Sequence, residues 1–388
     1  MDYTDNQLLL KDLFSLEQAE IHLPGKGTRV VNCSFRSPVQ PDGDPGALHV
    51  ADEDEGSLLV CQSDANSNFT YPVFMPPGRD QVSGAIMLLH GLNERSWSKY
   101  LYWAQYLCEE TGKAVILFPI AFHINRSPEY WSDPRLMSEI SFRRKERNDN
   151  QATPFNAALS TRLEMHPEWF CSSGVQSCYD IISLATDIRD GAHPLFAAGT
   201  RVDFFAYSVG AFLLEVMLLA NLDGLFSKSK SFLFLGGSTF EQMRGVSRYI
   251  MDQKAFDRLD EAFLRQDPSL IRNKIQLPKL STFNQLWHSF LSILRLDRMV
   301  GEREESFRQL SDRIAAIGLV RDRVIPGVSI LATLRGKLRP SEIPIQVLDF
   351  SYPYIHENPF PINQPKIRQA VDKAFHEVFS QAVLFLGA

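Results

Sequence analysis

The apolar residues of this chain fall into two alternating patterns. Short continuous apolar runs, typical of strands buried on both faces, recur between stretches that carry apolar residues at helical spacing. The runs lie at 84–89, 114–118, 202–206, 231–235, 314–320 and 345–350. The predicted helices lie at 99–110, 174–187, 211–219, 327–334 and 367–385. Strands that alternate with helices in this way predict an α/β fold with a mostly parallel central sheet flanked by helices.

Two parts of the chain depart from this alternation. Residues 1–80 contain strand-like runs at 28–35, 57–62 and 69–74 between Pro, Gly and Asp clusters, so we expect a β-rich extension of the core sheet. Residues 238–310 carry apolar stripes at helical spacing, which predicts a helical cap, or lid, between two core strands. A helical subdomain remote from any site would show the same stripes. The core would then comprise residues 81–237 and 311–388, and the polar residues 129–170 would form an excursion over its edge.

A serine, Ser208, stands between a predicted strand and a predicted helix. Ala206 and Gly210 lie two residues before and after it, where a sharp strand-to-helix turn admits only small side chains. Such a turn would lift the hydroxyl of Ser208 above the sheet. It would also place the N–H of Val209 at a helix N-terminus, where a developing oxyanion is stabilised. A serine that merely caps an ordinary helix would show the same short pattern.

Further polar residues follow other predicted strands. His90-Gly91-Leu92-Asn93 comes directly after the strand at 84–89, and a tight turn there could direct the N–H of Leu92 at a substrate carbonyl. Asp322 follows the strand at 314–320, and His356 lies in the loop after the last strand. A serine nucleophile needs a base, and an imidazole base needs an orienting carboxylate. Parallel strands bring their carboxyl ends to one edge of the sheet, so these residues can converge.

The order Ser, Asp, His resembles that of the α/β-hydrolase family, over the chain from about residue 84 onward. The string Asp322-Arg323-Val324-Ile325-Pro326 is similar to one that members often carry at the acid position. The resemblance implies a nucleophile elbow at 206–210, with alanine in place of the first glycine. It implies catalytic residues Ser208, Asp322 and His356, and an oxyanion hole formed by Leu92 and Val209. Asp349, at the end of the final strand, is the rival for the acid position.

An α/β-hydrolase of this kind would be a serine hydrolase, like an esterase or lipase, that acts on an ester, thioester or amide through an acyl-enzyme. An acyltransferase and a non-catalytic binding protein of the same fold are the alternatives. The residues next to the motifs become pocket candidates: His90, Gly91, Asn93, Tyr207 and His123. Arg126 lies in the same loop as His123, and both are equally well explained as ordinary loop polar groups.

Composition narrows the choice of partners. A formal net charge of -6 argues against nucleic acid, and the 44% of hydrophobic residues are typical of a globular protein. The sequence contains no His-Glu-x-x-His, no paired Cys spacing and no phosphate-binding glycine motif, so we expect neither a metal nor a cofactor, and a small acyl substrate as the partner. No apolar run is long enough for a signal peptide or a membrane span, which favours a cytoplasmic protein.

Overall fold

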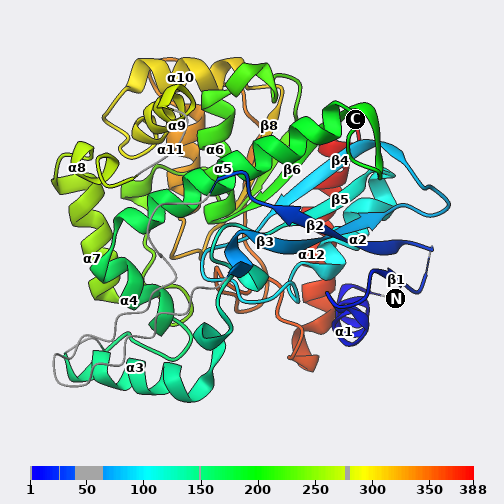
Figure 1. The fold of residues 1–388 in the computed structure, drawn as a ribbon, viewed down its shortest axis with the longest axis horizontal. Helices are drawn as coiled ribbons and strands as arrows, with labels where there is room; N and C mark the ends of the chain where they lie inside the picture. The colour runs from blue at the N-terminus through cyan, green and yellow to red at the C-terminus, as the bar shows by residue number, and fades with distance from the viewer. Residues whose placement is uncertain (1, 26, 40–63, 148–149, 276–279) are drawn as a thin grey trace.

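The computed structural model describes residues 2–25, 27–39, 64–147, 150–275 and 280–388. Within these residues one sheet of nine strands runs through the centre of the molecule, in the order β1-β2-β3-β5-β4-β6-β7-β8-β9 (Figure 1). The strands are β1 (Glu20–His22), β2 (Arg29–Arg36), β3 (Asn68–Met75), β4 (Val82–Leu89), β5 (Ala114–Phe118), β6 (Phe196–Tyr207), β7 (Ser231–Phe234), β8 (Ile314–Leu319) and β9 (Ile345–Leu348).

The direction of the strands divides the sheet into two parts. β1, β2 and β3 pair antiparallel, and β3 joins β5 antiparallel. From β5 to β9 every neighbouring pair is parallel. Leu89 pairs with both Phe118 and Ala206 near the carboxyl ends of their strands. The loops that leave β4, β5 and β6 therefore start at the same edge of the sheet.

Helices cover both faces of the sheet. Helices α5 (Glu168–Arg189), α6 (Val209–Ala220) and α11 (Gly327–Arg335) pack on one face, and α1 (Tyr3–Leu13), α2 (Leu101–Thr111) and α12 (Arg368–Gly387) on the other. Successive residues of β4 serve the two faces in turn: Met87 belongs to the core beneath α5 and α6, whereas Ile86 and Leu88 belong to the core beneath α2 and α12. This burial on both faces is why the central strands are continuous apolar runs.

Two insertions stand between core strands. One follows β5 and contains α3 (Pro134–Glu146) and α4 (Ala157–Met165). The other lies between β7 and β8 and contains α7 (Gln253–Asp260), a π-helical turn (Glu261–Arg265), α8 (Ser269–Arg272), α9 (Leu280–Ser292) and α10 (Val300–Gln309). Helix α4 packs against α7, and α9 packs against α6. The second insertion occupies the place where the apolar stripes predicted a helical cap.

The structure differs from the sequence pattern at two places. Helix α1 lies in the segment that was expected to be β-rich, and the ring of Tyr3 stacks on Phe375 of α12 at a centroid distance of 4.2 Å. The polar excursion at 129–170 contains helices α3 and α4, which were not among the predicted helices. The strand expected at 57–62 lies outside the described residues.

Candidate functional site

Ser208 occupies a strained turn between a strand and a helix. β6 ends at Tyr207, α6 begins at Val209, and Ser208 between them has φ 58° and ψ -124°. Non-glycine residues rarely adopt positive φ, and such strain persists only where the surrounding structure imposes it. The end of the neighbouring strand β4 lies so close that position 210 requires glycine. A Cβ there would lie 2.7 Å from the carbonyl oxygen of Leu89 and 2.8 Å from that of His90.

A series of hydrogen bonds connects Ser208 to two residues distant in sequence. The Oγ of Ser208 lies 2.7 Å from Nε2 of His356, and Nδ1 of His356 lies 2.7 Å from Oδ2 of Asp322. A carboxylate only accepts hydrogen bonds, so Nδ1 carries the imidazole proton and Nε2 is left to accept from the serine hydroxyl. All three residues are buried. The structure thus brings together Ser208, His356 and Asp322, from the loops that follow β6, β9 and β8.

The carboxylate of Asp322 is itself held in place. Its Oδ1 accepts hydrogen bonds from the backbone amides of Val324 and Ile325, at 2.8 and 2.9 Å. Asp349 lies elsewhere: its half-exposed carboxylate accepts hydrogen bonds from Arg321 Nε at 2.8 Å and from the hydroxyl of Tyr354 at 2.9 Å. Of the two acids considered from the sequence, Asp322 is the one that contacts His356.

Tyr207 fixes the position of the imidazole. Its ring lies nearly parallel to that of His356, with an interplanar angle of 20° and centroids 5.6 Å apart. Its hydroxyl donates a hydrogen bond to the backbone carbonyl of His356. Burial raises the pKa of Tyr207 well above its ordinary value, so the phenol stays protonated and keeps donating. Gly91 leaves room for this ring, because a Cβ there would lie 2.9 Å from Cε1 of Tyr207.

His90 shapes the loop after β4 and takes no part in the hydrogen-bonded series. Its Nδ1 donates to the carbonyl of Gly91 at 2.8 Å, and its Nε2 accepts from the amide of Ile120 at 2.9 Å. Burial, and then the neighbouring His123, hold the pKa of His90 well below its ordinary value. The neutral ring therefore serves as a fixed bridge between the loops that follow β4 and β5.

Two backbone amides in the loops that follow β4 and β6 make no hydrogen bond within the described residues. Among the described residues, the N–H groups of Leu92 and Val209 have no hydrogen-bond partner, whereas the N–H of Gly91 donates to the hydroxyl of Tyr100 at 3.0 Å. Leu92 and Val209 both line the pocket described below. These are the two amides that the sequence singled out.

Asn93 connects this loop to both insertions. Its backbone φ is 61°, and its side-chain amide donates to the carbonyl of Phe155 at 2.8 Å and to that of Tyr249 at 2.6 Å. Asn93 thus ties the loop of Leu92 to the insertions, and together with His123 and Arg162 it lines a hollow next to the apolar pocket described below.

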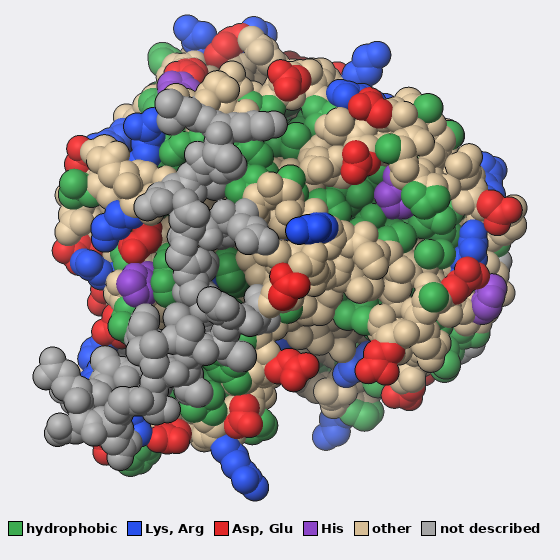
Figure 2. All heavy atoms as spheres, viewed as in Figure 1, with side chains coloured by type: hydrophobic (Ala, Val, Ile, Leu, Met, Phe, Trp, Pro, Cys, Tyr) green, Lys and Arg blue, Asp and Glu red, His purple; other side chains and the backbone are tan. Residues whose placement is uncertain are grey.

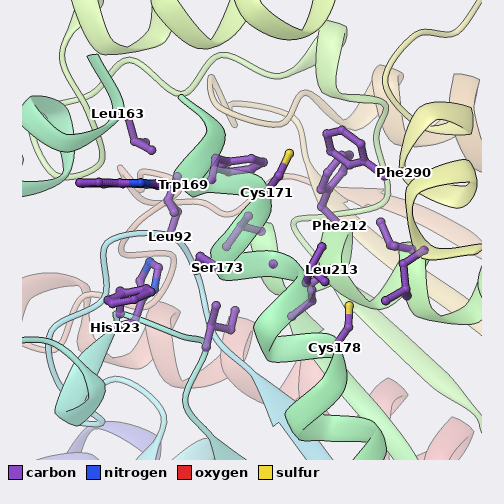
Figure 3. A pocket seen from close by; sticks show the side chains of 18 of the residues that line it. Leu92, His123, Leu163, Trp169, Cys171, Ser173, Cys178, Phe212, Leu213 and Phe290 are labelled. Carbon is purple, nitrogen blue, oxygen red and sulfur yellow. The ribbon is translucent and has the colours of Figure 1, made fainter. Parts of the chain in front are cut away.

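Leu92 and Val209 line an apolar pocket with about 830 Å³ of atom-free space, its open mouth included (Figure 3). Its walls come from the loop after β5 and from helices α4, α5, α6 and α9, and they include Phe122, Leu159, Leu163, Trp169, Phe170, Phe212, Leu213, Val216, Trp287 and Phe290. A lining that is mostly apolar and aromatic, with a few polar groups, is typical of sites for small organic molecules. The sequence did not predict that α4 and α5 line a pocket, because neither helix carries a recognisable motif.

His123 lines this pocket, as the sequence suggested, and its neighbour Arg126 does not. The guanidinium of Arg126 is fully buried, where it contacts the Asp180 carboxylate at 2.7 Å and the carbonyl of Asn66. The positive φ values of Phe122 and Ile124, 63° and 52°, show how sharply the chain turns on either side of His123.

The remaining surface carries charge of both signs. Figure 2 shows basic and acidic side chains interspersed over one face of the molecule. Within the described ranges, no three His, Cys, Asp or Glu side chains gather in a way that could hold a metal ion. None of the helices in those ranges combines the length and the apolar character that crossing a bilayer requires.

The parallel strands in the order β5-β4-β6-β7-β8-β9, the antiparallel strands beside β5 and the turn at Ser208 define an α/β-hydrolase fold. The chain belongs to a protein family of unknown function, DUF6051, whose model matches residues 1–387. No curated protein matches the chain by sequence.

Solved structures of esterases are similar to this chain in fold. An esterase of Pyrobaculum calidifontis is 11% identical with a TM-score of 0.46, and the match covers 98% of this chain and 91% of that one. Carboxyl esterase 2 of the fungus Tuber melanosporum is 11% identical with a TM-score of 0.42, covering 82% and 83%. An ester-hydrolase from the metagenome of Lake Arreo is 13% identical with a TM-score of 0.44, covering 92% and 84%.

Proposed function

We propose that this protein is a serine hydrolase that cleaves a small ester, thioester or amide through an acyl-enzyme. One observation carries the proposal: on a strained strand-to-helix turn, the hydroxyl of Ser208 is hydrogen-bonded to an imidazole whose other nitrogen is held by the buried carboxylate of Asp322. A serine hydroxyl is a weak nucleophile, and this arrangement is the one that activates it.

In the proposed reaction, Ser208 Oγ attacks the carbonyl carbon while Nε2 of His356 takes the hydroxyl proton. The carbonyl π electrons move to the oxygen, and the N–H groups of Leu92 and Val209 donate to the resulting oxyanion. When the bond to the leaving group breaks, His356 returns its proton to the departing alcohol, thiol or amine. Water then repeats the sequence on the acyl-enzyme, with His356 again as the base, and releases the acid. Asp322 stabilises the imidazolium that forms in each step.

The two insertions fit this proposal as the parts that select the substrate. We propose that residues 238–310 form a cap over the core made of 81–237 and 311–388, with residues 1–80 extending the sheet. Helix α9 supplies Leu286, Trp287 and Phe290 to the pocket wall, and helix α4 supplies Leu159 and Leu163. Variation in these walls would change which acyl groups fit, without change to the hydrogen-bonded series.

A fluorophosphonate probe tests the proposal directly, because it reacts preferentially with an activated serine. Wild-type protein should be labelled, and mass spectrometry should place the label on Ser208. Ser208→Ala should abolish labelling with little change in the thermal unfolding midpoint. The matched control is Ser238→Ala, which changes a buried serine in the loop after the neighbouring strand β7 and should leave labelling intact. Labelling that persists in Ser208→Ala would show that another residue reacts. Product analysis with an added alcohol distinguishes hydrolysis from acyl transfer.

A further inference from the structure

The position of the apolar pocket shows which half of a substrate it would hold, provided that the proposed function is correct. The leaving group must lie near Nε2 of His356, which returns the proton to it. Leu92 and Val209, whose amides are proposed to bind the oxyanion, both line the pocket, and none of its described lining residues belongs to the loop that carries His356. A substrate whose carbonyl oxygen lies between those amides therefore places its acyl group in the pocket.

The polar side chains of this pocket are few, and most have identified contacts. The hydroxyl of Ser173 donates to the carbonyl of Ala121 at 2.8 Å. The guanidinium of Arg162 lies over the ring of Trp131, 3.9 Å from its centroid. The imidazole of His123 differs from both. Its Nε2 is buried and, within the part of the chain that the structure describes, has no hydrogen-bond partner.

The hydrogen bond made by Nδ1 of His123 determines whether Nε2 is a donor or an acceptor. Nδ1 of His123 lies 2.9 Å from the carbonyl of Ala121, and because a carbonyl only accepts, Nδ1 carries a proton. Burial, together with the nearby charges of Arg162 and Arg126, lowers the pKa of His123 to about 4, so the ring is neutral near pH 7. A neutral imidazole protonated at Nδ1 has a lone pair on Nε2. Among the polar residues that line the pocket, His123 is therefore the one with a hydrogen-bond acceptor that lacks a partner in the described part of the chain.

A buried acceptor without a partner has an energetic consequence for ligand choice. An apolar acyl group that passes it leaves the lone pair desolvated, whereas a ligand that donates a hydrogen bond to it does not. Figure 3 shows His123 on the same side of the pocket as Leu92, one of the two amides proposed to bind the carbonyl oxygen. The donor on the ligand would thus belong to the acyl group.

We propose that His123 selects substrates whose acyl group is apolar but carries one hydrogen-bond donor, a hydroxyl or an amide N–H, which donates to Nε2. The aromatic residues Phe122, Phe212 and Phe290 enclose the apolar part of this group. The proposed substrates are esters of aryl or branched hydroxy acids, or of N-acylated apolar amino acids. His123 is a specificity-determining residue in this proposal, and Ser208 and His356 keep the roles described above.

The test compares esters that differ by a single donor. Ethyl 4-phenylbutanoate is compared with its 2-hydroxy and 3-hydroxy derivatives and their methyl ethers, and ethyl N-acetylphenylalaninate with its N-methyl counterpart, by titration of the released acid. We expect at least one donor-bearing ester to have a kcat/KM about tenfold higher than that of its blocked partner, the typical effect of one net hydrogen bond. The hydroxyl and N–H pairs show which donor is recognised.

Variants at position 123 connect the preference to the residue. The ratio of kcat/KM for the donor-bearing and blocked esters is measured within each variant, so that changes in overall rate cancel. His123→Phe should bring the ratio close to one, and His123→Gln, which keeps an acceptor, should retain part of it. Cys171→Ala changes another side chain of the pocket wall and should keep the wild-type ratio.

The outcomes separate this proposal from the proposed function. Fluorophosphonate labelling of Ser208 with ratios near one for every pair, or an unchanged ratio in His123→Phe, would overturn the role of His123 alone. A protein that neither labels nor hydrolyses any of the esters would overturn the proposed function instead. In that case calorimetry of the same esters with Ser208→Ala still tests the role of His123. Tighter binding of the donor-bearing esters that is lost in Ser208→Ala/His123→Phe would support this role. Equal binding of donor-bearing and blocked esters would refute it.

Discussion

At the scale of single residues, two acids end neighbouring strands and only one contacts the imidazole. Asp322 follows β8, has its Oδ1 fixed by two backbone amides and presents Oδ2 to His356. Asp349 follows β9 and is bound to Arg321 and Tyr354 at the surface. A small difference in loop path therefore decides which carboxylate can orient the base.

Asp322→Asn should lower kcat by roughly 10⁴ with little change in KM, if Ser208 is the nucleophile. The asparagine amide would favour the tautomer of His356 in which Nδ1 accepts, and Nε2 would then carry the proton and could not take one from Ser208. The control is Asp349→Asn, which should keep turnover within a small factor of wild type. Steady-state kinetics on an ester that the wild type hydrolyses measures both. A larger loss in a folded Asp349→Asn protein would contradict the assignment.

At the scale of elements, the two insertions are fastened to each other. Arg144 of α3 contacts both carboxylate oxygens of Asp252, at 2.5 and 2.8 Å, and also Glu164 at the end of α4 at 2.7 Å. Asp252 is fully buried and caps α7 by accepting from the amide of Ala255 at 3.1 Å. The insertion after β5 and the insertion after β7 thus share a buried ion pair.

Arg144→Met should lower the free energy of unfolding by about 3–5 kcal/mol, because it leaves the carboxylate of Asp252 buried without its cation. Chemical denaturation measures this loss, and limited proteolysis should show earlier cleavage within α3 and α4. Arg143→Met is the matched control on the same helix. Arg143 pairs with Glu139 at the surface, and such pairs contribute about 0–1 kcal/mol. Equal losses in the two variants would show that the contact with Asp252 does not fasten the insertions.

The insertion between β7 and β8 also packs into the hydrophobic core. Single substitutions in it therefore test its role in substrate choice better than its removal does. Phe290 of α9 packs edge-on against Phe212 of α6, with ring centroids 6.0 Å apart. Residues of α7 and α9 belong to the same hydrophobic cluster as α5 and α6. Replacing residues 238–310 by a linker would uncover α6, and loss of the fold would then say little about substrate choice.

At the scale of the whole molecule, buried neutral histidines make stability depend on pH. Burial holds the pKa of His90 well below its ordinary value and lowers that of His123 to about 4, from 6.5. The charges of Lys99, Arg126 and Arg162 near these rings contribute to the low pKa values. Between pH 6.5 and 4 the unfolded chain therefore binds more protons at these positions than the folded protein does, and stability falls as the pH falls.

Urea denaturation at pH 7.5 and pH 5 measures this dependence, and the variant isolates His123. The loss of stability on acidification should be smaller in His123→Gln than in wild type by on the order of 2 kcal/mol. The comparison is needed because Glu215 acts in the opposite direction: burial raises its pKa well above the ordinary value, so its contribution weakens as the pH rises. An equal loss in the two proteins would show that His123 is protonated in the fold or exposed to solvent.

The sequence by itself determined the features that depend on local patterns. The alternation of apolar runs and helical stretches predicted the mostly parallel sheet, because a strand that is buried on both faces must be apolar along its whole length. The small residues around Ser208 predicted the turn. The physical reason is steric, since Gly210 lies against the backbone of Leu89 and His90 and leaves no room for a side chain. The grouping of Ser208, Asp322 and His356 could also be predicted from the sequence, because each residue follows a predicted strand of the same sheet.

Only the tertiary structure decided what depends on contacts between distant segments. The choice between Asp322 and Asp349 required the path of two loops, and the pocket wall required α4, α5 and α9 to meet α6. Helix α1 forms against α2 and α12, so its stability comes from packing that no local period reveals. The acceptor on His123 is the clearest case: the residue type is visible in the sequence, but which nitrogen is free depends on the carbonyl of Ala121 and on burial among side chains from several helices.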